Sequence, residues 1–288
     1  MTQLLTHHPA KTSKVNTLSG RYNVLHDLGQ GATSKVSLAR DERTGDLVAV
    51  KRLFEAVAEH NTPRMRREFK ALEQFSHPNI VRVIEYADQA SPPYLVLEYV
   101  QGRDLQHWLS KNPPLEQVVS VFAAIADALD HVHQIGLVHR DLKPENIRVD
   151  FHGRPKLLDF GLTKPIENNM TAITRMGALV GTALFMAPEQ CRAGLIDART
   201  DLYSLGALMY TSFTGQPPFL GDDAIQVMRQ HLEAPPIRPT ALNPNIPPVL
   251  EALILSLLAK NPAERPQSAG YVRDLLRALV PPDPLTGD

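Results

Sequence analysis

The sequence has very little cysteine and no excess of charge of one sign, and each shortage removes a class of protein. Cys191 is the only cysteine among 288 residues, so no disulfide can form within the chain and a reducing, cytoplasmic location is predicted. The formal net charge is −1. A nucleic-acid-binding surface needs a basic excess, so no nucleic-acid partner is predicted. Cys191 itself is interpreted as an inert, small apolar residue.

Long apolar runs are also missing. The longest candidates, 118–129 and 249–259, are each interrupted by an acidic residue and are shorter than the roughly 20 residues of a membrane-spanning helix. No membrane contact is therefore predicted for this segment. Residues 1–20 are polar and are predicted to form a flexible arm. Residues 280–288 are predicted to be a proline-rich tail or the start of a linker, so the chain could be the cytoplasmic domain of a larger protein.

Short strands are predicted to dominate the first third of the chain. They cover the segments 22–25, 36–39, 47–50, 81–86 and 94–98. One helix is predicted from Arg64 to Phe75, where apolar residues recur at helical spacing. Thr62 is its expected N-cap and Pro63 its expected first residue.

Helical periodicity takes over after Gly102. The predicted helices cover 118–132, 200–213, 222–232, 247–260 and 268–279. The pattern predicts an α+β fold with two lobes, a small β-rich one with one helix and a larger, mainly helical one. The expected boundaries of the domain and its parts are 21–279 for the whole, 21–98, a hinge at 98–103, and 104–279. We expect the chemistry in a cleft between the lobes.

The most informative stretch is His-Arg-Asp-Leu-Lys-Pro-Glu-Asn at 139–146, followed by Asp-Phe-Gly at 159–161. Transfer of a phosphoryl group from ATP to a hydroxyl needs a carboxylate beside the hydroxyl and oxygen ligands for Mg²⁺. Asp141 can supply the carboxylate, and Asn146 and Asp159 can supply the metal ligands. Lys143, two residues after Asp141, can reach the transferring group. The two motifs at this spacing predict phosphoryl transfer.

Two further motifs fit the same chemistry. Gly29-Gln30-Gly31 and the small Ser34, where a third glycine is usual, form a loop whose backbone N–H groups can bind phosphates. Lys51 ends an apolar strand, from which it can reach the α- and β-phosphates. Its orienting carboxylate is predicted to be Glu68, with Glu73 as the alternative, because Glu68 shares a helical face with Leu72.

With these residues in this order, the chain resembles the protein kinase family over about residues 21–279. The match includes Ala-Pro-Glu at 187–189 and Asp-Leu-Tyr-Ser-Leu-Gly at 201–206. Lys143 and Gly181-Thr182 resemble the serine/threonine branch, and the chain looks most like the eukaryotic-like Ser/Thr kinases of bacteria.

The resemblance implies roles for further residues. Leu97 is the implied gatekeeper, the backbones of Glu98 and Val100 would bind adenine, and Asp104 would reach the ribose. Apolar contacts to the base are implied for Val36, Ala49 and Ile147. Leu72, Val83, His139 and Phe160 match a stacked spine, so the implied role of His139, like that of Gly161, is structural.

Regulation and peptide binding are implied as well. Arg140 matches a receptor for phosphate on the activation segment, where Thr171 and Thr174 are the predicted autophosphorylation sites. Gly181 and Thr182 are expected to dock the peptide. Asp201 matches a structural position, and Glu189 and Arg265 are expected to form a buried ion pair.

The sequence thus predicts a protein serine/threonine kinase that uses ATP with Mg²⁺, or Mn²⁺ in its place, and acts on proteins, either as a monomer or as a homodimer. Two alternatives stay open. A pseudokinase scaffold would normally lack the lysine, the aspartate or a metal ligand. A small-molecule phosphotransferase of related fold would not need Ala187-Pro188-Glu189 or the docking element.

Overall fold

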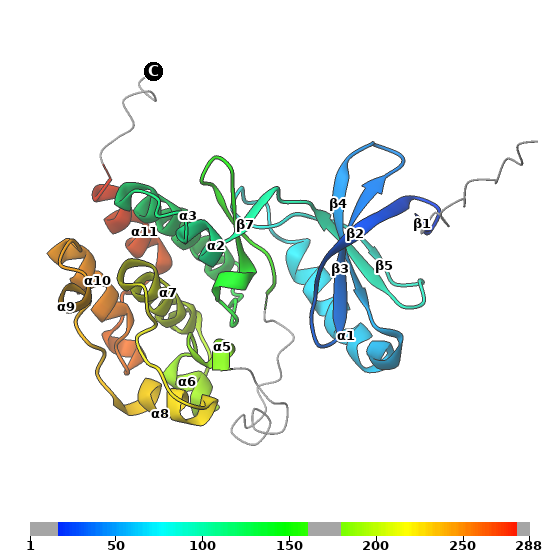
Figure 1. Ribbon diagram of the computed structural model, residues 1–288. Coiled ribbons are helices and arrows are strands. Elements are labelled where there is room, and N and C mark those ends of the chain that lie inside the picture. Colours follow the sequence, from blue (N-terminus) through cyan, green and yellow to red (C-terminus); the bar gives the residue numbers. More distant parts are fainter. Residues whose placement is uncertain (1–16, 161–179, 281–288) are drawn as a thin grey trace, which may run out of the picture. The chain divides into compact units, whose positions relative to one another are not determined.

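The computed structural model describes residues 17–160 and 180–280, which fall into two compact units (Figure 1). The strand-rich unit comprises residues 17–63 and 83–99. The helical unit comprises residues 64–82 and the described residues from 100 onwards.

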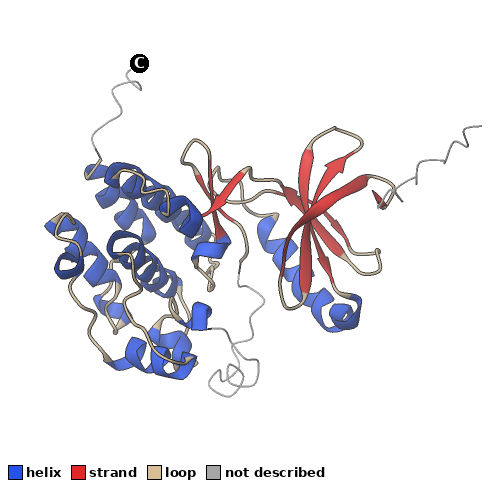
Figure 2. Ribbon diagram, in the orientation of Figure 1, coloured by secondary structure: helices blue, strands red, loops and turns tan. Residues whose placement is uncertain are grey.

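The strand-rich unit is built on one antiparallel sheet of six strands in the order β1-β2-β3-β4-β6-β5 (Figure 2). The strands are β1 (Thr17–Leu18), β2 (Tyr22–Gln30), β3 (Ser34–Asp41), β4 (Leu47–Leu53), β5 (Val83–Ala87) and β6 (Tyr94–Glu98). One face is packed by a cluster of buried residues, which are Tyr22, Ala39, Val48, Val50, Tyr94 and Val96. Residues 17–20, expected in the flexible arm, instead form a strand and a turn, because Thr17 and Leu18 pair with Asn23 and Tyr22.

The helix α1 (Glu55–Leu72) begins earlier than its N-cap and proline signals predict. Thr62 is not its N-cap, and Pro63 lies inside it. The Thr62 hydroxyl donates to the carbonyl of Ala58 at 2.7 Å, and the Asn61 amide donates to the carbonyl of Val57 at 2.8 Å. These side chains bind carbonyls of the preceding turn, and the proline is accommodated although it provides no N–H group.

The helical unit combines a small sheet with a set of packed helices. Its strands are β7 (Gly102–Asp104), β8 (Ile147–Asp150) and β9 (Pro155–Leu157), in that order in the sheet. Its longer helices are α3 (Leu115–Gln134), α7 (Ala198–Thr214), α8 (Ala224–Glu233), α10 (Pro248–Leu257) and α11 (Ala269–Ala278). Its short helices are α2 (Leu105–Leu109), α5 (Val180–Ala183), α6 (Pro188–Cys191) and α9 (Pro239–Leu242), with 3-10 turns at Pro144–Asn146 and Pro262–Glu264.

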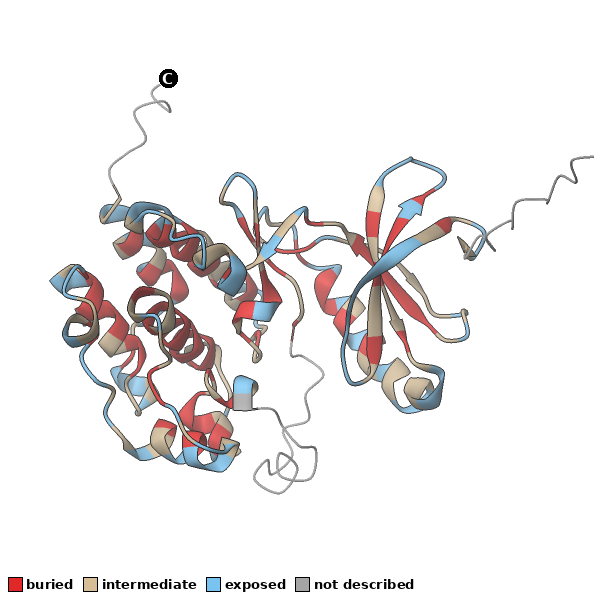
Figure 3. Ribbon diagram, in the orientation of Figure 1, coloured by how far each residue is buried: buried red, intermediate tan, exposed pale blue. Residues whose placement is uncertain are grey.

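Helix α7 is the core of the helical unit, because every residue from Thr200 to Tyr210 is buried (Figure 3). Asp197 caps its N-terminus by accepting from Arg199 N, and Gly215 ends it in the left-handed conformation, at φ 81°. Helix α7 packs against α10, and α3 packs against α11. Among the described residues, no helix is both long and apolar enough to cross a membrane.

Candidate functional site

Asp141, Lys143 and Asn146 lie together in one loop of the helical unit. The 3-10 turn Pro144–Asn146 folds Asn146 back, so that its amide nitrogen lies 2.8 Å from the Asp141 carbonyl oxygen and 3.2 Å from Asp141 Oδ2. The Lys143 ammonium lies 3.2 Å from the same Oδ2. The spacing of these residues in the sequence therefore becomes a compact group of one carboxylate, one cation and one amide.

A buried carboxylate in α7 fixes the backbone of this loop. Asp201 is fully buried and accepts hydrogen bonds from His139 N at 2.7 Å and Arg140 N at 2.8 Å. Burial alone would raise the pKa of Asp201, but its hydrogen bond to His133, at 2.8 Å, and the neighbouring charge keep the pKa below its ordinary value. Arg140 takes a left-handed conformation, at φ 67°, which is strained for a residue with a side chain. Asp201 holds it there.

Asp159 follows β9 beside this loop. Leu158 N donates to the carbonyl of Asn146 at 2.9 Å, which brings the start of the Asp-Phe-Gly motif next to Asn146. The Phe160 ring is buried, with its centroid 4.6 Å from that of His139 and 4.9 Å from that of Phe75. The packing of His139 against Phe160 agrees with a structural role for that histidine.

The oxygen atoms that Asn146 and Asp159 offer as metal ligands suit a magnesium ion that is also bound by phosphates. Among the described residues, no group of three or more His, Cys, Asp or Glu side chains could hold a metal by itself. The amide nitrogen of Asn146 donates to Asp141, so its amide oxygen is the atom left to bind a cation. Magnesium is commonly held by one or two carboxylates plus substrate phosphates, and Asn146 with Asp159 would supply such a partial set.

The strand-rich unit places the predicted nucleotide-binding residues on one face of its sheet. Gly29 pairs with Val36, and Val36 pairs with Lys51 on the next strand. Two residues along β4, Ala49 pairs with Leu97. Successive side chains of a strand point to opposite faces, so the side chains of Val36, Ala49, Lys51 and Leu97 share one face.

The departure from glycine at Ser34 fits the hairpin. Gly31 N donates to the carbonyl of Ser34 at 2.8 Å, which closes the turn between β2 and β3. Ser34 is buried, with 8% of its surface exposed, and pairs with Leu53. A small side chain is therefore accommodated at this position.

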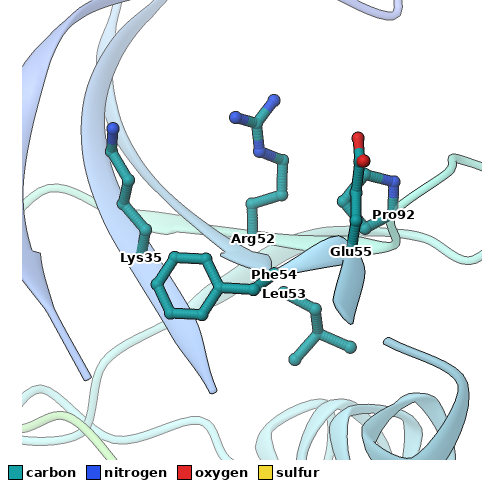
Figure 4. A pocket seen from close by; sticks show the side chains of 6 residues that line it. All are labelled: Lys35, Arg52, Leu53, Phe54, Glu55 and Pro92. Carbon is teal, nitrogen blue, oxygen red and sulfur yellow. The ribbon is translucent and has the colours of Figure 1, made fainter. Parts of the chain in front are cut away.

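A hollow of about 290 Å³ lies in the strand-rich unit (Figure 4). It is lined by Lys35, Arg52, Leu53, Phe54, Glu55 and Pro92. Lys35 and Arg52 are cross-strand partners, and each is adjacent in sequence to Val36 or Lys51, so their side chains occupy the opposite face of the sheet. Lys35 and Arg52 therefore point away from the nucleotide candidates, whereas Leu53, which also lines the hollow, pairs with Ser34 of the glycine-rich turn.

Glu68 and Glu73, the two candidates for the carboxylate that orients Lys51, differ in burial. Glu68 is only 6% exposed in α1, whereas Glu73 is exposed. A buried carboxylate needs a partner, which favours Glu68. Its pairing with Lys51 stays a prediction. Asp104 is the N-cap of α2, accepting from His107 N at 2.8 Å, and its predicted contact with a ribose also stays a prediction.

The predicted ion pair between Glu189 and Arg265 is confirmed. Arg265 holds the Glu189 carboxylate with both terminal nitrogens, at 2.7 and 2.9 Å, and the Thr200 hydroxyl adds a third hydrogen bond at 2.8 Å. Next to Glu189, burial raises the pKa of the Cys191 thiol to about 12, in keeping with an inert cysteine.

The activation-segment predictions fall partly outside the described residues. Gly161, Thr171 and Thr174 lie there. Gly181 and Thr182 belong to α5, with Gly181 exposed. The Nε atom of Arg140 is buried and has no hydrogen-bond partner among the described residues, so this donor is left without an acceptor there.

Sequence reasoning missed three residues that support the loop. His133 binds Asp201, and Phe75 stacks on Phe160. Gln190 donates to the carbonyl of Arg140 at 2.9 Å while accepting from Ala187 N at 3.0 Å, so it connects the loop to α6. None of them stands in a local motif, and only spatial contact identifies them.

Comparisons with known proteins agree with this geometry. A family model described as "Protein kinase domain" matches residues 22–276. The chain is 38% identical over 269 residues to "Serine/threonine-protein kinase PknB" of Mycolicibacterium smegmatis, covering 90% of this chain and 43% of that protein. It is 37% identical over 263 residues to "DNA damage-responsive serine/threonine-protein kinase RqkA" of Deinococcus radiodurans, covering 90% and 39%.

Among solved structures, the kinase domain of Mycobacterium tuberculosis PknI is similar, with a TM-score of 0.70 and 25% identity, covering 92% of this chain and 98% of that one. The predicted α+β fold class is thereby confirmed. The chain spans about two fifths of the length of the curated relatives named above.

Proposed function

Because this chain belongs to the protein kinase family, we propose that it transfers the γ-phosphoryl group of ATP to serine or threonine hydroxyls of proteins. One observation carries the proposal. Asp141, Lys143 and Asn146 are gathered in one loop, with the Lys143 ammonium and the Asn146 amide both at 3.2 Å from the Asp141 carboxylate. The names of its relatives support serine and threonine as acceptors.

Each residue has a distinct part in the proposed reaction. The Asp141 carboxylate orients the acceptor hydroxyl and finally takes its proton, and Lys143 neutralises charge on the transferring group. Lys51, oriented by Glu68, binds the α- and β-phosphates. Asn146 and Asp159 would hold Mg²⁺, which neutralises phosphate charge when bound.

The remaining nucleotide contacts are proposed from the resemblance. The glycine-rich turn with Ser34 covers the phosphates. Leu97, Glu98, Val100 and Asp104 bind adenine and ribose, between the apolar side chains of Val36, Ala49 and Ile147. We place the activity in the cytoplasm, which the single buried cysteine supports.

The completeness of the site favours a kinase over a pseudokinase scaffold. A pseudokinase usually lacks the lysine, the aspartate or a metal ligand, and all of these residues are in the chain. A small-molecule phosphotransferase would not need the Ala-Pro-Glu segment at 187–189, yet that segment is anchored here through the Glu189–Arg265 ion pair.

The test is phosphate transfer from labelled Mg·ATP to a generic basic protein, with sugars and aminoalcohols as competing acceptors. We expect transfer to serine and threonine of the protein. Asp141→Asn should lower turnover at least about 100-fold with an unchanged melting temperature, because the general base is lost. Asp222→Asn, an exposed aspartate, is the control. Transfer to the small molecules alone would refute the proposal.

We further propose activation by autophosphorylation at Thr171, Thr174 or both, with Arg140 as the receptor of the phosphate. The Nε donor of Arg140, which has no hydrogen-bond partner among the described residues, supports this. The Thr171→Ala/Thr174→Ala double variant should gain no activity on pre-incubation with Mg·ATP, whereas the wild type should. Equal activation of both proteins would contradict it.

A further inference from the structure

Three polar side chains of the helical unit, two of them fully buried, are linked by hydrogen bonds close to residues 181–184, which include the predicted peptide-docking residues Gly181 and Thr182. Lys260, which follows α10, places its ammonium 3.5 Å from the hydroxyl of Tyr203 in α7. That hydroxyl lies 2.8 Å from Nδ1 of His231 in α8. Tyr203 and His231 are both 0% exposed. The ammonium is also held by the carbonyl of Gln230, at 3.2 Å, and lies 4.1 Å above the Phe219 ring.

The protonation states of the three side chains at neutral pH follow from their burial. Burial lowers the pKa of His231 to about 3, so its ring is neutral and carries one N–H. Burial raises the pKa of Tyr203, so its hydroxyl keeps its proton. Burial lowers the pKa of Lys260 to about 8, which leaves most of it charged at pH 7.

These protonation states indicate which group donates in each hydrogen bond among the three side chains. An ammonium has donors only, so Lys260 donates to the hydroxyl oxygen of Tyr203. A hydroxyl oxygen can accept twice, so the direction of its bond to His231 depends on the tautomer of that ring. Among the described residues, Nδ1 of His231 is the acceptor within reach of the Tyr203 proton, which favours donation to Nδ1 and a ring proton on Nε2.

His231, the last of the three side chains, faces residues 181–184. The backbone of Leu184 and Ala183 lies near enough to His231 to raise its pKa, although Nε2 completes no hydrogen bond among the described residues. These two residues directly follow Gly181 and Thr182. A buried, unsatisfied N–H is costly, and a small approach of the segment would satisfy it.

We propose that Lys260, Tyr203 and His231 form a hydrogen-bond relay that positions residues 181–184 to receive the protein substrate. The inference rests on the proposed kinase function. Packing supports it, because Ala183 is buried in one cluster with Cys191 of α6 and Val227 and Met228 of α8. The three relay residues are positioning residues, so their loss should affect the peptide more than ATP.

The kinetic test uses variants that change the relay and little else. Tyr203→Phe removes one hydroxyl and keeps the ring, so the peptide KM should rise about 5- to 10-fold, as expected for one buried hydrogen bond. The KM for ATP and kcat should stay within about twofold. His231→Gln, which keeps an N–H near the place of Nε2, should retain most of the peptide affinity, whereas His231→Leu should not.

The matched control is Tyr210→Phe. It removes a second buried hydroxyl from the same helix, one that donates to the carbonyl of Ile237 at 3.0 Å, outside the relay. Its peptide KM should equal that of the wild type. If Tyr203→Phe behaves like Tyr210→Phe, or if it lowers kcat and the melting temperature without a change in peptide KM, the relay is refuted.

A second measurement does not depend on activity. Long-range ¹⁵N–¹H NMR spectra of the unliganded chain distinguish the two neutral tautomers of a histidine, and we expect His231 to carry its proton on Nε2. An Nδ1–H tautomer would overturn the relay even if peptide is phosphorylated. A wild type that phosphorylates no protein, with His231 in the expected tautomer, would instead refute the kinase function and leave the relay without a substrate to position.

Discussion

The buried ion pair between Glu189 and Arg265 should contribute strongly to the stability of the helical unit. The Arg265 side chain is 0% exposed and that of Glu189 is 9% exposed. Besides the carboxylate, Arg265 binds three carbonyl oxygens, those of Ala259 at 2.9 Å, Arg199 at 2.7 Å and Lys260 at 3.4 Å. Arg265→Met would leave a buried carboxylate and three carbonyls without this donor.

The expected loss follows from that arrangement. Removing one partner of a buried ion pair costs about 3–5 kcal/mol, because the other charge stays buried and unpaired. We expect about 4 kcal/mol for Arg265→Met. In a chain of this size, each 1 kcal/mol lowers the melting temperature by roughly 2–4 °C, so the midpoint should fall by about 8–16 °C.

Thermal and urea unfolding of four proteins would test this reasoning, namely the wild type, Arg265→Met, Glu189→Gln and the double variant. The double variant has no buried charge in this pair, so it should be more stable than Arg265→Met. Arg192→Met, which changes an exposed arginine next to α6, is the control. A loss below about 1 kcal/mol in Arg265→Met, or purely additive losses in the double variant, would refute the account.

Three further outcomes are expected. Asp159→Asn should lower turnover more than Asn146→Ala, because Asp159 brings a formal charge to Mg²⁺; full rescue of Asp159→Asn alone by high Mg²⁺ would reverse this order. Ser34→Gly should change the ATP KM only modestly, since the serine already fits the hairpin, and nucleotide binding that appears only in the variant would instead indicate a pseudokinase. Lys260 has a folded pKa of about 8, against about 10.5 when unfolded, so from pH 8 to 10.5 the unfolded state binds more protons and the contribution of Lys260 to stability rises with pH. Urea unfolding over this range should show the wild type gaining stability relative to Lys260→Met, and parallel pH curves would contradict the assignment.

The parts of the site that the sequence predicted are those whose geometry is local. Asp141, Lys143 and Asn146 lie within six residues, so one 3-10 turn is enough to bring their side chains together. The face of the sheet that carries Val36 and Lys51 also follows from strand alternation alone. The Glu189–Arg265 pair was expected only from the family resemblance, since nothing in the sequence connects residues so far apart.

The parts that could not be predicted depend on tertiary contacts. The start of α1 was placed too late because Thr62 and Pro63 are good signals for a helix beginning, and in this helix Asn61 and Thr62 instead bind carbonyls of the preceding turn. The pairing of β1 with β2 lies in a segment whose polar composition resembles an arm. His133 and Phe75 contact partners that are distant in the sequence. The hydrophobic periodicity of a helix indicates only that such residues face inward, and it does not identify their partners.

The carboxylate of Asp201 has a consequence for the motions of the loop it holds. His139 and Arg140 lie outside any helix or strand, and in most proteins the amide protons of such residues exchange quickly with solvent. Here both amides donate to a side chain of the most buried helix in the helical unit. Their exchange therefore requires α7 itself to loosen, and on the timescale of hydrogen exchange this irregular loop belongs to the same cooperative unit as that helix.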